Sequence, residues 1–258
     1  MNSSEIKKKV AEEYIKIAYE YDKTRFGEPY RLVWHELEVN LMKKFLRRDF
    51  SILEVGVGTG RFVLSLTKFV KTFTGVDISL PMLKLSKEKI ADASIDNVDF
   101  VNADAEHLPF KSNTFDLVFS MHVMWHLPFD VQENILSELV RVTKPRGKII
   151  FDTGNARTVS LPHKLRHKKI DFEKVGYFID DGMLDKIISR HRLKLVGVYG
   201  FRQFLPFSHK IPKIPNVIQN STLVIKSIKC INNLFSKCKL FRLIALSIYF
   251  VFEKRFDA

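Results

Sequence analysis

The chain has 258 residues, of which 46% are hydrophobic and 28% charged, and 22 of them are phenylalanine. This composition provides enough apolar area for a folded core and excludes a chain that is disordered throughout. Cys230 and Cys238 form no Cys-x-x-Cys pair and have no histidine cluster nearby, which argues against a zinc site and favours free thiols in a reducing compartment.

The formal net charge of +13 is confined to the C-terminal part of the chain. Residues 1–156 hold 22 basic and 22 acidic side chains, so the whole excess lies in residues 157–258. Basic residues interleaved with Phe and Ile suit an anionic partner: a membrane surface, a phosphorylated small molecule or RNA. The alternative is that these lysines only cover the solvated faces of an insertion with an apolar core.

Neither end of the chain predicts a membrane-spanning or exported protein. The first 21 residues lack the apolar run of a secretory signal. The longest apolar run near the other end, Leu240–Phe252, has 13 residues and includes Arg242, whereas a spanning helix needs about 20. We expect a cytoplasmic protein, with peripheral membrane contact as an option.

The first segment, residues 1–47, contains two amphipathic stretches. They cover Glu5–Tyr19 and Pro29–Phe45, and the turn-rich sequence YDKTRFGEP separates them. We expect a helical cap here.

Residues 48–156 alternate strand-like and helix-like segments. Helical patterns at 61–70, Pro81–Ala91 and 131–142 separate the strands, and Ser79 can cap the second of these helices. Such alternation predicts a doubly wound, mostly parallel sheet. The predicted strands are Ser51–Val55, Phe73–Asp77, Val98–Asn102, Asp116–Ser120 and Gly147–Thr153.

Residues 157–258 predict the remaining strands together with an insertion. A helix is expected at Asp181–Arg190 and strands at Leu193–Gly200 and Ser247–Lys254. Between those strands lie three prolines and an amphipathic stretch, Asn220–Phe235, which predict a basic, partly helical insertion over the sheet edge.

The sequence EVGVGTG at 54–60 carries the strongest functional signal. It joins a predicted strand to a predicted helix, and its three glycines permit a tight turn with close approach to a ligand. The dinucleotide fingerprint needs glycine where Arg61 stands, and no Walker lysine follows. The pattern therefore favours a nucleotide-like ligand of another kind.

Two carboxylates extend this signal. Asp77 ends the next strand 17 residues after Gly60, close to the offset of about 20 at which a carboxylate binds ribose hydroxyls. The alternative is that Asp77 only caps the following helix. Asp104 and Ala105, after the third strand, offer an acceptor for an adenine amino group beside an apolar wall.

Four motifs together resemble those of class I S-adenosylmethionine-dependent methyltransferases, especially the ubiquinone/menaquinone-biosynthesis-like branch with a methyltransferase type 11 domain. They are ILEVGVGTGRF, FTGVDIS, VNADAEHLPFKSNTFDLVFSMHVMWHLP and ELVRVTKPRGKIIF, and the resemblance covers about 21–152. It implies a Rossmann-like seven-stranded sheet ordered 3-2-1-4-5-7-6, with strand seven antiparallel. Where the family usually has Pro-Gly-Gly, this chain has Pro145, Arg146 and Gly147, and where it has cysteine or a small residue, this chain has Val57.

The resemblance also implies the roles of individual residues. Residues 54 and 56–60 would contact the methionine portion of the cofactor, Asp77 the ribose, and the residues after the second and third strands the adenine. Tyr21 and Arg25 match a Tyr-Asp-x-x-Arg element that often closes over the cofactor, or they only join the cap to the core. The implied cofactor-binding set is Tyr21, Arg25, Glu54, Gly56, Val57, Gly58, Thr59, Gly60, Asp77, Ile78, Met82, Asp104, Ala105, Glu106, Ser120 and Met121.

His122 and His126 follow the fourth strand, at the end of the site where the methyl group would lie. An imidazole titrates in the range suited to a general base, so both are candidate catalytic residues. The alternative is that each is a hydrogen-bonded structural histidine. Trp125, between these histidines, is expected either to line the ligand pocket or only to fill the core.

We expect a methyltransferase that uses S-adenosylmethionine, releases S-adenosylhomocysteine, needs no metal, and acts on a small-molecule or lipid-linked acceptor. An RNA-modifying methyltransferase is the first alternative, although no RNA-binding motif is recognisable. A catalytically silent cofactor-binding module is the second. A nicotinamide-dependent oxidoreductase is disfavoured by Arg61.

Overall fold

The computed structural model describes residues 2–26, 29–155, 177–201, 226, 229–230, 245 and 247–256. Most of the predicted C-terminal insertion lies outside these residues, as do the greater part of the predicted helix Asn220–Phe235, the side chain of Arg25, and Cys238. Cys230 is an exposed free cysteine. In the part of the chain described, no helix is long and apolar enough to cross a membrane.

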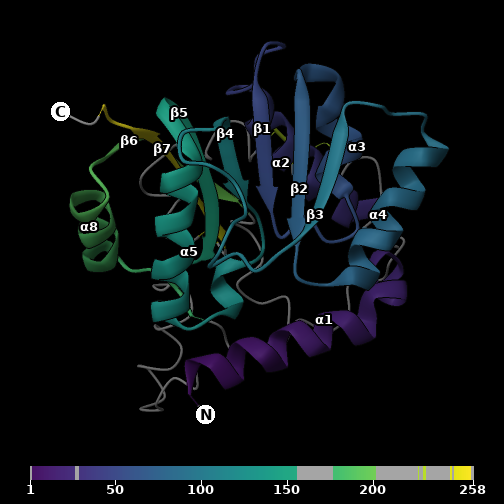
Figure 1. The fold of residues 1–258 in the computed structure, drawn as a ribbon, viewed down its shortest axis with the longest axis horizontal. Coiled ribbons are helices and arrows are strands. Elements are labelled where there is room, and N and C mark those ends of the chain that lie inside the picture. The colour runs from purple at the N-terminus through teal and green to yellow at the C-terminus, as the bar shows by residue number, and fades with distance from the viewer. Residues whose placement is uncertain are drawn as a thin grey trace.

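A seven-stranded sheet forms the centre of the molecule, in the order β3-β2-β1-β4-β5-β7-β6 (Figure 1). The five strands β1 to β5 run parallel, and β7 is antiparallel to both β5 and β6. This arrangement confirms the predicted Rossmann-like fold. The strands are β1 (Ser51–Val55), β2 (Thr72–Asp77), β3 (Val98–Asn102), β4 (Phe115–Ser120), β5 (Thr143–Gly154), β6 (Leu193–Phe201) and β7 (Ser247–Lys254).

Helices cover both faces of the sheet because neighbouring strand residues point to opposite sides. Ile52 packs with α2, α3 and α4 on one face, while Leu53 packs with α5 and α8 on the other. Both faces are buried, which explains the continuous apolar runs of the central strands. The covering helices are α2 (Pro29–Lys43), α3 (Arg61–Leu66), α4 (Leu80–Asp92), α5 (Phe129–Val142) and α8 (Asp181–Arg190); two short 3₁₀ turns, η1 (Thr67–Phe69) and η2 (Met124–His126), follow α3 and β4.

Helix α1 (Ser3–Phe26) belongs to neither layer. It lies across the edge of the sheet where β1 and β2 end, running from the α5 side to the α4 side (Figure 1). The prediction that the helix ends near Tyr19 was wrong. The chain meets no glycine or proline before Gly27, and Asp22 in the added turns bonds Thr59 and Lys89, so tertiary contacts extend the helix to Phe26.

Strand β5 begins four residues before the predicted Gly147. Thr143 already pairs with Phe115 on β4, and the register shifts between Phe115 and Leu117. Within this irregular stretch Arg146 has a φ of 64°, a left-handed conformation that glycine adopts without steric cost. Arginine thus occupies a backbone position suited to the glycine that the family pattern has there.

Candidate functional site

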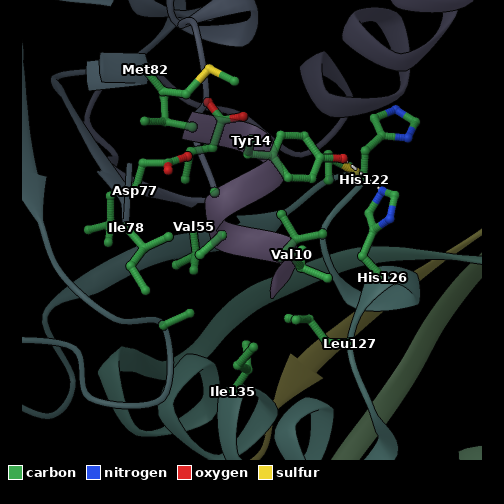
Figure 2. Close-up of a pocket in the computed structure, with 18 of the residues that line it drawn as sticks. Val10, Tyr14, Val55, Asp77, Ile78, Met82, His122, His126, Leu127 and Ile135 are labelled. Atoms are coloured by element: carbon green, nitrogen blue, oxygen red, sulfur yellow. Dashed lines mark hydrogen bonds between the residues drawn. The ribbon is translucent and has the colours of Figure 1, made fainter. Parts of the chain in front are cut away.

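An open cavity lies at the carboxyl ends of the parallel strands (Figure 2), and its empty space, open solvent included, is about 1030 Å³. Its wall comes from the loops after β1, β2, β3 and β4, and α1 closes one side. Ligands of open α/β sheets bind at this edge, where strand order reverses on either side of β1.

The glycine loop turns sharply beneath the cavity. Gly56, Gly58 and Gly60 all have positive φ, at 80°, 55° and 77°. A Cβ atom on Gly56 would lie 2.2 Å from the side chain of Val123, so that position has no room for a larger residue, whereas a Cβ on Gly58 would meet nothing within 4 Å. A side chain at Gly58 would therefore meet open space, although Gly58 itself does not line the cavity.

Asp77 is organised by backbone amides. Its two carboxylate oxygens accept hydrogen bonds from Gly58 N and Ser79 N, each at 2.8 Å. Burial raises the pKa of this carboxyl, and the amide hydrogen bonds act in the opposite direction. The N-cap of α4 is Ser79, whose Oγ accepts from Met82 N at 3.4 Å. Ser79 rather than Asp77 therefore caps this helix, and the role of Asp77 on the cavity wall as a ribose acceptor stays a prediction.

Glu54 lies at the end of β1 and is fully buried, with 2% of its surface exposed. Its Oε2 atom has no hydrogen-bond partner among the described residues. Burial raises the pKa of Glu54 well above its usual value, despite the opposing charge of Arg61. A buried acceptor without a partner is costly, so its position on the cavity wall suits a ligand that donates a hydrogen bond.

At another part of the wall, Asp104 and Ala105 follow β3. The Nζ atom of Lys7, from α1, lies 2.6 Å from Asp104 Oδ2 and also pairs with Glu106. Glu106 is held from its other side by Asn134, and it does not line the cavity. In the structure Glu106 therefore supports Lys7 rather than the ligand space.

His122 lies between two buried carboxylates. Its Nε2 is 2.9 Å from Glu38 Oε1 and its Nδ1 is 3.4 Å from Asp152 Oδ2. The backbone amide of His122 donates to Asp152 Oδ1 at 2.6 Å, and the residue adopts a φ of 61°. Left-handed backbone is strained for a residue other than glycine. The two carboxylates thus fix both the ring and the backbone.

The carboxylate of Glu38 is the centre of this cluster. It also accepts a hydrogen bond from the Tyr249 hydroxyl at 2.5 Å and pairs with Arg61 Nη1 at 3.0 Å. Burial raises the pKa of Asp152, while the charge of His122 opposes that effect. The carboxylates of Glu38 and Asp152, the guanidinium of Arg61 and the imidazole of His122 thus meet in one buried cluster.

His126 occupies a different environment on the same wall. Its Nε2 is 2.9 Å from the Tyr14 hydroxyl of α1, and its ring lies against Trp125 with centroids 4.0 Å apart. Trp125 itself does not line the cavity but packs near Phe178. The histidine can therefore exchange a proton with a tyrosine that faces the cavity.

The structure brings most of the predicted site residues to one cavity (Figure 2). Gly58, Gly60, Glu106 and Ser120 do not line the cavity, and Ser120 is fully buried. The side chain of Arg25 is outside the described residues. The predicted residues on the wall are Tyr21, Glu54, Gly56, Val57, Thr59, Asp77, Ile78, Met82, Asp104, Ala105, Met121, His122 and His126.

Sequence reasoning missed the contribution of α1. Lys7, Val10, Ala11 and Tyr14 line the cavity, and their spacing of three, four and seven residues is the stripe that one helix face presents. That stripe could have identified the face directed at the site. Arg61 was noted only as a departure from the dinucleotide pattern, yet it also lines the wall.

Comparisons with known proteins agree with this geometry. Residues 53–151 match the family model described as a methyltransferase domain. An uncharacterised methyltransferase of Anoxybacillus flavithermus is 31% identical over 136 residues, which cover 52% of this chain and 62% of that protein. A demethylmenaquinone methyltransferase of Listeria monocytogenes is 30% identical over 146 residues, or 55% of this chain and 60% of that protein. The chain thus spans about three fifths of the length of these relatives.

Solved structures share the fold at lower identity. Magnesium protoporphyrin IX methyltransferase from Synechocystis PCC 6803, with bound SAM, is 14% identical with a TM-score of 0.64, covering 96% of this chain and 97% of that one. The [4+2]-cyclase SpnF is 15% identical with a TM-score of 0.57, covering 85% and 80%. The second example shows that this fold does not by itself fix the reaction. Residues 53–151 of the chain thus match the methyltransferase domain family, and the chain shares its Rossmann-like fold with these solved structures.

Proposed function

We propose that the whole chain is a methyltransferase that binds S-adenosylmethionine in the cavity and transfers its methyl group to a small-molecule or lipid-linked acceptor. The observation that carries this proposal is the carboxylate of Asp77 on the cavity wall, which accepts a hydrogen bond from the amide of Gly58 in the glycine turn. This pairing places a carboxylate and a tight glycine turn at the switch point of the sheet, inside a methyltransferase domain.

The residues present fit that cofactor in three ways. Asp77 would accept hydrogen bonds from the ribose hydroxyls. The unpaired Oε2 of Glu54 would accept a hydrogen bond from the ammonium of the methionine portion. Ile78, which is 44% exposed, would cover one face of the adenine while Asp104 and Ala105 meet its edge. These assignments use acceptors and apolar surface where the cofactor has donors and an aromatic ring.

When bound, the cofactor supplies a methyl group on a positively charged sulfur, an already activated donor. The protein then needs to position the acceptor, exclude water and, for some acceptors, take up a proton. Helix α1 and the loop after β4 perform the first two tasks, because they enclose the cavity from two sides. Met121 and His122 would stand beside the reacting centre.

The two histidines would differ in role. Both ring nitrogens of His122 face carboxylate oxygens, so this residue would form part of the rigid wall rather than remove the proton of the acceptor. His126 touches the Tyr14 hydroxyl, which can pass a proton from the cavity to the imidazole. An acceptor with an ionisable hydroxyl or amine would use His126, and an acceptor that is already nucleophilic would need neither histidine as a base.

An apolar part of the wall supports an acceptor of low polarity. Val10, Leu127 and Ile135 gather below Tyr14 in Figure 2. One relative is a demethylmenaquinone methyltransferase, and an apolar small molecule of that general kind would suit such a wall. The basic C-terminal residues, interleaved with Phe and Ile, would favour a lipid-linked acceptor at an anionic surface over RNA.

The proposal is tested with methyl-labelled S-adenosylmethionine and a cell extract. Label is counted in the organic, small-molecule and RNA fractions, with Asp77→Ala as the control. We expect label in the organic or small-molecule fraction that is absent with the variant. Label in the RNA fraction alone would contradict the proposed acceptor and indicate an RNA-modifying methyltransferase. Cofactor binding without transfer to any fraction would favour a catalytically silent module.

A further inference from the structure

Helix α1 contributes to the cavity through one face, and Lys7 is the charged member of that face. Lys7, Val10, Ala11 and Tyr14 all line the cavity, whereas Lys8 and Lys9 are exposed to solvent. The helix lies outside the segment that matches the methyltransferase family model. The matched segment alone therefore does not supply this side of the cavity.

Lys7 joins α1 to the loop after β3. Its ammonium lies 2.6 Å from Asp104 Oδ2 and also contacts Glu106. The side chains of Lys7, Asp104 and Glu106 are 22%, 34% and 12% exposed, so solvent screens these two ion pairs less than it screens ion pairs on the surface. Burial acts to raise the pKa of Asp104, but the Lys7 and Glu106 hydrogen bonds outweigh it and the net shift is downward.

The contact fixes the geometry of Asp104 at the cavity wall. One carboxylate oxygen pairs with Lys7, and the other accepts from Glu106 N at 3.0 Å. A carboxylate oxygen has two acceptor directions, so Asp104 can hold Lys7 and still accept a hydrogen bond from a ligand. The orientation of this carboxylate thus depends on a residue that is 97 positions away in the chain.

Other contacts fasten the two ends of α1 without touching Asp104. Ser3 Oγ donates to Asp130 at 2.7 Å near the start of the helix. Near its end, Asp22 accepts from Thr59 Oγ1 at 2.5 Å and pairs with Lys89. Loss of Lys7 alone would therefore leave the helix attached at both ends while it releases the contact over the cavity.

We propose that Lys7 is a positioning residue of the cofactor site, which holds α1 over the adenine end of the cavity and orients Asp104 toward the adenine amino group. This inference rests on the proposed function. It assigns retention of the cofactor to a helix outside the matched domain. It also predicts that removal of the Lys7 charge speeds cofactor release more than it slows cofactor entry.

The test uses S-adenosylhomocysteine as the probe and the full chain in four forms: wild type, Lys7→Met, Lys7→Arg and Lys9→Met. Calorimetry gives the Kd, stopped-flow displacement gives the dissociation rate, and thermal unfolding verifies that each variant is folded. Methionine keeps the apolar stem of lysine and removes its charge. Lys9 lies two positions along the same helix and is exposed, so it is the matched control.

We expect Lys7→Met to raise the Kd about tenfold, chiefly through faster dissociation, with Lys7→Arg within about threefold of wild type and Lys9→Met unchanged. This difference should shrink at high salt because screening weakens the ion pair. An unchanged Kd and dissociation rate for Lys7→Met overturn the inference while the proposed function stands. Failure of the wild type to bind the probe overturns the proposed function, and this inference with it.

Discussion

The two ends of the cavity are built in different ways. At the Asp77 end, a single carboxylate is held by amides of neighbouring loops, and the segment from Glu54 to Ser79 supplies nearly every part. At the His122 end, polar and charged side chains from α2, α3, β5, β7 and the loop after β4 meet in a buried cluster around Glu38. The first end is local backbone with open space beside it, which suits a ligand that enters and leaves. The second is a long-range network of charges, which suits a rigid wall.

The largest expected effect is at the centre of the charged cluster. Glu38→Ala would remove the carboxylate that pairs with the buried guanidinium of Arg61, and breaking a buried ion pair in this way costs about 3–5 kcal/mol. The free energy of unfolding, measured by urea denaturation, should fall by that amount.

Glu36→Ala is the control for this prediction, since Glu36 lies on the same helix with a side chain that is 52% exposed. It should change the free energy of unfolding by less than about 0.5 kcal/mol. Equal losses for the two variants would mean that the Glu38 cluster adds nothing beyond helix stability, and the contrast between the two ends of the cavity would disappear.

A smaller effect tests how the glycine loop is coupled to the His122 end. Gly56→Ala adds a methyl group that would meet Val123, next to His122, at 2.2 Å, and it also strains a residue with φ of 80°. We expect a loss of about 3 kcal/mol from overpacking and backbone strain combined. Gly58→Ala has open space and should cost only about 1 kcal/mol. Similar losses of stability for both variants would show that the cost comes from backbone conformation alone. The contact with Val123 would then not couple the two ends of the cavity.

The smallest effect concerns pH. Burial, followed by the nearby charge of Arg61, lowers the pKa of His35 from 6.5 to about 4. Between about pH 6.5 and pH 4 the unfolded chain therefore binds a proton at His35 that the folded protein does not bind. Protonation of the unfolded chain lowers the free energy of unfolding, so the stability is highest above pH 6.5 and falls as the pH falls toward 4. Between pH 7 and pH 5 the wild type should lose about 2 kcal/mol more than His35→Gln, measured by urea unfolding. Parallel stability curves for the two proteins would contradict this reading.

The contrast between the two ends also explains what the sequence could predict. Asp77 and the glycine loop were found because the chain keeps them close together, with spacings set by one strand, one turn and one helix. The sheet order followed from the family resemblance and is confirmed. Local chemistry and short connections are visible in a single sequence.

The cluster around Glu38 could not be predicted in the same way. Its members Glu38 and Tyr249 are 211 positions apart, and only the folded chain brings them together. Glu38 by itself resembles any acidic residue on an amphipathic helix. The same reason hid the Lys7 contact with Asp104, although the apolar stripe of α1 gave a partial signal.

The central claim is that the cavity binds the cofactor of a methyltransferase through Asp77. The most direct measurement is calorimetric titration of S-adenosylhomocysteine into the wild type and into Asp77→Asn, a substitution that keeps the shape of the side chain and removes its charge. The account predicts binding to the wild type with a Kd that the variant raises about a hundredfold, because a buried charged acceptor is lost. Binding of equal strength by both proteins, or by neither, would contradict it.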